Sequence, residues 1–341
     1  MGKFLARRLF TGAFVLFVVV TVAFLLAAVV PSDPAEKWVG PHATSEQKAA
    51  ARIELGLDKP LVVRYVNYLV NLVKGDMGMS IVSHRPVSVE LAEAIPNTLE
   101  LVIWSVALAF LAGLFLGVYS AYKENTALDH FSRFFSISII STPSFWLALI
   151  LQIIFSSTLH WLPLTGQMDT VLKLTHPLTE VTGLPLLDSI ITGNWTVAGN
   201  LALHMVLPVL TLSSFSLALT ARMTRSILLE VLNEDYIRAA RAYGLKERVV
   251  LWRHAIKNVI GTVVTMLALS AGNALVNTFV VEAVFSWPGV GNLIARSVMN
   301  LDYPAIIGVT VFAAIAYVLL NLVADIVIAL DPRVRLAQGG N

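Results

Sequence analysis

The segment 101–122, LVIWSVALAFLAGLFLGVYSAY, is 22 residues long and contains no charged side chain. A helix needs about 20 apolar residues to cross the roughly 30 Å hydrocarbon core of a bilayer. The segment therefore predicts a transmembrane helix, and it indicates that the rest of the chain should be searched for others.

The whole chain is apolar: 57% of its 341 residues are hydrophobic, 13% are charged, and its mean hydropathy is +0.75. Soluble domains have about 45–50% apolar and 25% charged residues, and disordered chains are still more polar. Both classes are excluded. The net charge of +2 is too small to indicate nucleic acid as a partner. Because there is no cysteine, disulfides, thiolate metal sites and cysteine nucleophiles are excluded as well.

Five further segments are uncharged and close to the length of a span. A seventh apolar segment, 184–203, contains Asp188, whose insertion into a membrane is costly, so we expect a loop or interfacial segment there. The apolar run near the N-terminus exceeds the ~7–15 residues of a signal peptide, so we expect it to be an uncleaved span. The six predicted transmembrane helices are 9–30, 101–122, 134–159, 205–221, 258–281 and 303–324.

Lysine and arginine predict the orientation of these spans, since short cytoplasmic segments are enriched in them. The segment before the first span has three, the 123–133 loop two, the 222–257 loop eight, and the tail after residue 330 two. On the opposite side, Lys173 and Arg296 each stand alone in their loops. The pattern predicts that both termini are cytoplasmic, in an all-α polytopic membrane protein.

The 31–98 segment is predicted to form a small extracytoplasmic subdomain. Thr44 and Gln47 have the spacing of a capping box, Gly56 is a helix stop, and 61–73 has helical periodicity. The apolar side of that last helix is expected to carry Tyr65, Tyr68 and Leu72. The expected divisions are 1–30 for the N-terminus and first span, 31–98 for the subdomain, 99–330 for the core with the loop 222–257, and 331–341 for a cytoplasmic tail.

Motifs of catalysis are missing from the sequence. It contains no G-x-x-x-x-G-K-[ST] phosphate loop, no H-E-x-x-H metal motif and no G-x-S-x-G nucleophile elbow. The seven histidines are scattered along the chain. We therefore expect no catalytic residue, no metal site and no cofactor bound by this chain.

Polar side chains inside predicted spans often face an aqueous path or another helix. Asn273 and Asn277 are four residues apart and share a helix face, and Glu282 follows near the end of the same span. We expect these three residues to line a translocation path, although hydrogen bonding between helices is the alternative for the two amides. Few other ionisable groups lie in the spans, which argues against a proton-coupled secondary transporter.

The 222–257 loop has eight basic and four acidic side chains, more than orientation requires. Residues 236–242 favour a helix, Gly244 ends it, and 246–256 favour a second helix. A positively charged anchor on anionic lipid would explain the charge but not this arrangement. The loop therefore predicts a contact surface for another protein.

In this loop the string DYIRAARAYGL at 235–245 resembles the cytoplasmic E-A-A-x-x-x-G signature of membrane permease subunits of ABC importers. RMTRS at 222–226 and RHAIKN at 253–258, which flank it, are similar to the dipeptide, oligopeptide and nickel permease branch. Arg238 stands where the signature has glutamate. Similarity continues through ELGLDKP at 54–60, GDMG at 75–78, FSWPG at 285–289, DYP at 302–304 and LDPR at 330–333.

The resemblance implies half of a translocation path, paired with a second homologous permease in a bacterial cytoplasmic membrane. Two separate ATPase subunits would use ATP-Mg, and an extracytoplasmic binding protein would deliver short peptides. Nickel chelates, glutathione-like compounds, cationic peptides and oligosaccharides are alternative cargoes; a secondary transporter and a membrane-embedded enzyme are rival classes. The residues expected to couple to an ATPase are Asp235, Tyr236, Arg238, Ala239, Ala240, Arg241, Gly244, Leu245 and Arg248, and those expected to form an outer gate or docking contact are Trp287, Pro288 and Gly289.

Overall fold

The computed structural model describes residues 2–29, 33–40 and 42–330, and within them the regular structure is helical. The chain divides into two compact units. One comprises Met1–Thr98 with Trp287–Val318, and the other Leu99–Ser286 with Leu319–Asn341. Two of the three boundaries between the units fall inside long helices, α5 (Val87–Tyr122) and α15 (Tyr303–Leu330), and the third lies between Ser286 and Trp287.

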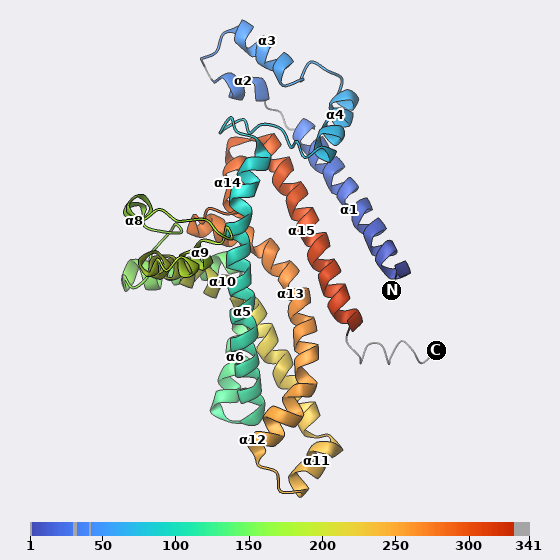
Figure 1. The fold of residues 1–341 in the computed structure, drawn as a ribbon, viewed down its shortest axis with the longest axis vertical. Coiled ribbons are helices and arrows are strands. Elements are labelled where there is room, and N and C mark those ends of the chain that lie inside the picture. The colour runs from blue at the N-terminus through green and yellow to red at the C-terminus, as the bar shows by residue number, and fades with distance from the viewer. Residues whose placement is uncertain (1, 30–32, 41, 331–341) are drawn as a thin grey trace. The chain divides into compact units, whose positions relative to one another are not determined.

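The first unit is built on α1 (Gly2–Val29) and the opening part of α15 (Figure 1). The predicted capping box starts α3, where Thr44 accepts from the Gln47 backbone and the Gln47 side chain accepts from the Thr44 backbone. Gly56, in a left-handed conformation, follows the end of α3 as expected. The remaining helices of this unit are α2 (Pro34–Val39), α3 (Ser45–Glu54), α4 (Leu61–Val73) and α14 (Val290–Asn300).

The α4 helix begins and ends at the predicted residues, and its aromatic side packs on α1. The ring of Phe24 lies 5.3 Å from that of Tyr65 and 5.7 Å from that of Tyr68. The Tyr65 hydroxyl also forms a 2.6 Å hydrogen bond with Thr21. Leu72 packs against the same small core, which includes Ile307 of α15. The predicted apolar side of this helix is confirmed.

The second unit is built around the contact between α10 (Trp195–Leu232) and α13 (Ile256–Phe285). At 1.5 Å per residue, α10 is roughly 57 Å long, so it extends well beyond a membrane core. The other elements of the unit are α6 (Ala127–Ile140), α7 (Ser144–Leu151), the π-helix η1 (Gln152–Thr158), α8 (Thr170–Thr175), α9 (Pro185–Ile191), α11 (Asp235–Ala242), α12 (Glu247–Val249) and the π-helix η2 (Val250–Ala255).

Four helices of the described chain are long and apolar enough to cross a membrane: Phe10–Ala28, Val87–Tyr122, Trp195–Leu232 and Tyr303–Val323. Two bent pairs raise the number to six if each pair forms one span. The chain is therefore a polytopic, all-helical membrane protein in its described part. Six spans with both termini on the cytoplasmic side remain a prediction.

One expectation about the spans is wrong in detail. The 134–159 segment is not one continuous helix, because α6 and the α7–η1 helix meet at 111° across the break before Pro143. Proline has no amide hydrogen and disfavours helical backbone in the residue before it. The 184–203 segment, expected to be a loop or an interfacial segment, is mostly helical. Its first half forms α9, and its second half is the opening of α10.

Candidate functional site

The loop after α10 folds into the predicted helix, glycine turn and helix, at the end where α10 stops and α13 approaches (Figure 1). The α11 helix runs over Asp235–Ala242, and the chain then turns at Gly244, whose φ is +75°. A Cβ at Gly244 would meet no atom of this chain within 4 Å. The glycine is thus required by the backbone conformation and not by crowding within the chain.

One side of α11 packs on the chain's own core. Ile237 is fully buried and Ala240 is 8% exposed, in a cluster with Leu228 of α10 and Val250 of η2. Ala240 belongs to the set of residues expected to contact an ATPase, and in the structure its side chain is nearly buried in the chain's own core. Its methyl group faces inward because Ile237 and Ala240 are three residues apart and share the buried face of the helix.

The opposite side of α11 and the turn carry exposed side chains. Tyr243 is 87% exposed, and Ala239 lies on the open face of the helix. Arg241 donates to both carboxylate oxygens of Glu247, at 2.7 and 3.2 Å, which closes the turn and raises the pKa of Arg241. Asp235, Tyr236, Arg238, Leu245 and Arg248 of the expected contact set are likewise exposed.

The base beneath this surface is held by a buried ion pair that the sequence reasoning missed. Asp129 of α6 is fully buried, and Arg225 of α10 binds its two oxygens through Nε at 2.6 Å and Nη2 at 2.8 Å. The Ser120 hydroxyl of α5 donates to the same carboxylate at 2.6 Å. The pair therefore joins α5, α6 and α10. Its sequence signal was weak, since Arg225 belongs to the RMTRS string but no rule links it to an aspartate 96 positions away.

Two glycines bring α5 and α10 together nearby. A Cβ at Gly113 would lie 2.7 Å from Thr220, and a Cβ at Gly117 would lie 2.5 Å from Thr224. This small-x-x-x-small spacing allows close approach of membrane helices. Together with the ion pair, it makes the end of α10 a rigid support for α11.

The residues expected to line a path do not share one environment. Asn273 and Asn277 are exposed on α13, and the Asn277 amide donates to the Asn273 carbonyl at 3.1 Å. Glu282, one turn further on, is fully buried. The two asparagines thus lie on an open helix face, whereas the carboxylate of Glu282 lies inside its own unit.

The expected gate at 287–289 is a packed turn in the first unit. Trp287 is fully buried, and its indole nitrogen donates to the Asn97 carbonyl at 3.1 Å. The Asn97 amide donates back to the Pro288 carbonyl at 3.0 Å. Gly289 is buried and Pro288 is exposed. Of the three expected residues, only Pro288 offers a surface to another molecule.

The segment between η1 and α10 is tied down by polar side chains of the second unit. Gln152 donates to the Leu164 carbonyl at 2.9 Å, and Glu100 accepts from the Leu186 backbone at 2.8 Å. Asp188 is almost fully buried; burial raises its pKa, but hydrogen bonds from the Thr182 side chain and from the 181–183 backbone outweigh that effect and lower it. This outer segment is therefore an ordered part of the fold.

Among the described residues, no group of three or more histidine, aspartate or glutamate side chains could hold a metal ion. The geometry instead defines a class of protein: a polytopic membrane protein with an exposed, charged surface outside its candidate spans. Such a surface suits a transporter subunit that another protein moves.

The chain belongs to the family of inner membrane components of binding-protein-dependent transport systems. Residues 113–336 match the model of that family, and residues 1–102 match the model of its N-terminal region. The chain is therefore the membrane permease component of an ABC importer and not a catalytic subunit.

Similar proteins cover almost the whole chain. The chain is 41% identical over 94% of its length to the probable D,D-dipeptide transport system permease protein DdpB of Escherichia coli (strain K12), covering 94% of that protein. It is 36% identical over 98% of its length to the di/tripeptide transport system permease protein DppB of Pseudomonas aeruginosa (strain UCBPP-PA14), covering 99% of that protein. It is 35% identical over 98% of its length to the glutathione transport system permease protein GsiC of Salmonella typhimurium, covering 99% of that protein.

Proposed function

We propose that this chain forms half of the translocation path of an ATP-driven importer for short peptides in a bacterial cytoplasmic membrane. The observation that supports this most directly is the 35–41% identity, over nearly the whole chain, to permeases named for dipeptides and tripeptides. Glutathione is the favoured alternative cargo, because a permease named for it is 35% identical. Nickel chelates, cationic peptides and oligosaccharides are further alternatives.

The proposed assembly contains a second homologous permease, two ATPase subunits and an extracytoplasmic binding protein. The exposed side of α11 and the turn at Gly244 would contact an ATPase, which uses ATP-Mg that this chain does not bind. Placing α11 next to an ATPase requires both termini to be cytoplasmic, as the lysine and arginine pattern predicts. Because Ile237 of α11 belongs to one buried cluster with Leu228 of α10 and Val118 of α5, displacement of α11 would move those helices as a body.

The open face of α13 at Asn273 and Asn277 would line the path together with the second permease. Its amides can hydrogen-bond to peptide groups without a fixed charge, which suits cargoes of varied sequence. The buried Glu282 would hold the end of α13 in place and would not touch the cargo. Exposed Pro288 would contribute to docking of the binding protein, with Trp287 holding the turn from inside.

Transport is tested by reconstituting the chain with its partner subunits and the binding protein in vesicles, and by measuring uptake of a labelled dipeptide. Uptake should require ATP and the binding protein. Uptake driven by an ion gradient without ATP would contradict the importer assignment. If the binding protein retained glutathione but no dipeptide, the peptide cargo would be wrong, whereas the assignment to an ATP-driven importer would stand.

The contact surface is tested with single cysteines at neighbouring positions, in a chain that contains no other cysteine. Ala239→Cys, on the open face of α11, should crosslink to an ATPase subunit in the assembled transporter. Ala240→Cys, on the buried face, is the matched control and should give no such adduct. Free reaction of the cysteine at 239 with soluble maleimide in the full assembly, without an adduct, would contradict the coupling role.

A further inference from the structure

The first unit contains a cavity of about 330 Å³ between α1, α4 and the start of α15. Its apolar wall includes Phe24 near the end of the span Phe10–Ala28, and Ile307 near the start of the span Tyr303–Val323. Both residues lie within the first or last few positions of their spans, so the cavity is at the boundary of the hydrocarbon core. Lipid phosphates occupy that depth of a bilayer.

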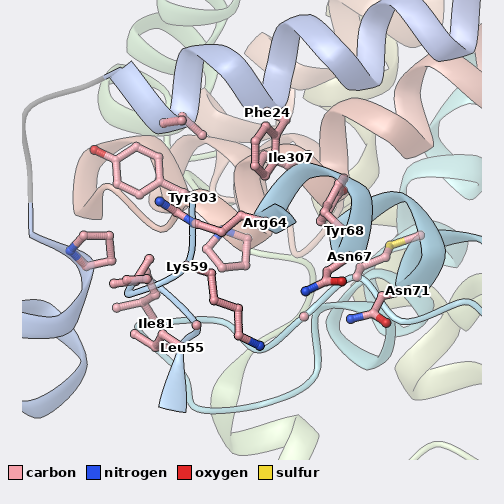
Figure 2. A pocket seen from close by; sticks show the side chains of 18 of the residues that line it. Phe24, Leu55, Lys59, Arg64, Asn67, Tyr68, Asn71, Ile81, Tyr303 and Ile307 are labelled. Atoms are coloured by element: carbon pink, nitrogen blue, oxygen red, sulfur yellow. The ribbon is translucent and has the colours of Figure 1, made fainter. Parts of the chain in front are cut away.

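Four polar side chains form the other wall: Lys59, Arg64, Asn67 and Asn71. Figure 2 shows Phe24 and Ile307 beside α1, with Lys59, Asn67 and Asn71 on the opposite side of the cavity. None of the four side chains forms a hydrogen bond or ion pair with another described residue. Arg64 is half-buried and the other three side chains are exposed, so all four can contact a ligand that enters the cavity.

The faces of α4 indicate which ligand. Arg64, Asn67 and Asn71 follow the i, i+3, i+7 spacing of one helix face, and that face lines the cavity. The side opposite Arg64 carries a valine row in which Val62 is 72% and Val73 is 89% exposed. A helix in water would have the reverse arrangement, with valines covered and polar groups outside. Asn67 and Asn71 are exposed as well, and Arg64 is half-buried. The arrangement fits a helix whose valine side is in lipid and whose polar side faces a lipid headgroup.

We propose that this cavity binds the phosphate headgroup of a membrane glycerophospholipid, with Arg64 and Lys59 contacting the phosphate and the first part of an acyl chain resting on Phe24 and Ile307. Asn67 and Asn71 would donate to the phosphate or ester oxygens, since a guanidinium, an ammonium and amides are all suitable donors to them. Glu54 also lines the cavity and is exposed, so an amine-bearing headgroup would find an acceptor there. The proposal does not depend on the identity of the transported cargo.

The experiment uses the full chain, purified from vesicles of phosphatidylethanolamine and phosphatidylglycerol, and counts retained phospholipids by native mass spectrometry. The double variant Lys59→Gln/Arg64→Gln should lower retention of one tightly held phospholipid by about tenfold, because two charge-assisted contacts are lost. Lys74→Gln, which removes a charge just after the end of α4 but outside the cavity, is the matched control and should retain the lipid. Equal retention by both variants would overturn the proposal.

Two competitors test whether the bound phosphate belongs to a lipid or to a soluble molecule, and whether the transported cargo binds in the cavity. Glycerol 3-phosphate, which has the headgroup chemistry without acyl chains, should displace the lipid poorly, and displacement at comparable concentration would reassign the cavity as a soluble anion site. Dialanine should not displace the lipid; if it did, the cavity would belong to the transport path. Either displacement would overturn the lipid assignment, whether or not the chain imports peptides.

Discussion

The loop after α10 and the turn at 287–289 are alike in sequence, since each places an aromatic residue within two positions of a glycine at the break between two helices. In the structure they are opposites: Tyr243 is 87% exposed, whereas Trp287 is fully buried and hydrogen-bonded to Asn97. The first break presents side chains on a rigid base, and the second hides its aromatic ring to hold its own unit together. Similar local chemistry is therefore exposed in one region and packed in the other.

Alanine substitutions of Trp287 and Tyr243 should distinguish a packing role from a surface role most strongly. Trp287→Ala should destabilise the protein by about 3–5 kcal/mol, because a buried aromatic side chain leaves a cavity and its hydrogen bond is lost. Tyr243→Ala should change stability by no more than about 0.5 kcal/mol, yet lower substrate-stimulated ATP hydrolysis in the assembled transporter. Thermal unfolding in detergent and ATPase assays measure both effects. A stable Trp287→Ala variant with impaired uptake would instead favour a gating role for that residue.

The base of the contact surface should be the next most sensitive feature. Arg225→Ala leaves the buried Asp129 carboxylate without its cation and should cost about 3–5 kcal/mol. Arg222→Ala removes an exposed arginine three positions earlier in the same helix and should be nearly neutral. Thermal unfolding of both variants provides the comparison. Similar losses would mean that charge at this end of α10 matters more than the buried pair.

Substitution of Gly244 should reduce stability less than Arg225→Ala does, and its main effect should be on binding of the ATPase subunits. A non-glycine residue at a φ of +75° costs about 1–2 kcal/mol, and no neighbour in the chain obstructs the added Cβ. Gly244→Asp should therefore fold, yet bind ATPase subunits weakly. Gly199→Ala, at a helical glycine that also has open space, is the control and should lose neither property. Normal ATPase binding by Gly244→Asp would remove this turn from the contact surface.

The ion pair that closes the turn should have the smallest effect. Arg241 and Glu247 have side chains that are 42% and 39% exposed, and such pairs contribute about 0–1 kcal/mol. Arg241→Glu should be mildly destabilising, and the exchange Arg241→Glu/Glu247→Arg should restore stability if only the pair matters. If stability returns while ATPase binding does not, the arginine itself contacts the partner.

Much of this protein was predictable from the sequence, because the signals are local. Uncharged segments of span length identify a membrane protein, the period of 61–73 predicts α4 and its aromatic side, and Gly244 marks the turn after α11. The string at 235–245 was sufficient to indicate the permease family. Each of these features depends on the properties of residues within a few positions of one another.

Tertiary structure alone decided which of these residues are available to other molecules. It pairs Asp129 with Arg225 across 96 positions, turns Ala240 inward and leaves Ala239 open, and buries Trp287 and Glu282. It also brings Lys59 and Arg64 to a cavity beside Phe24. The physical reason is that burial and pairing depend on which distant segments meet, and the sequence pattern of a single segment does not contain that information.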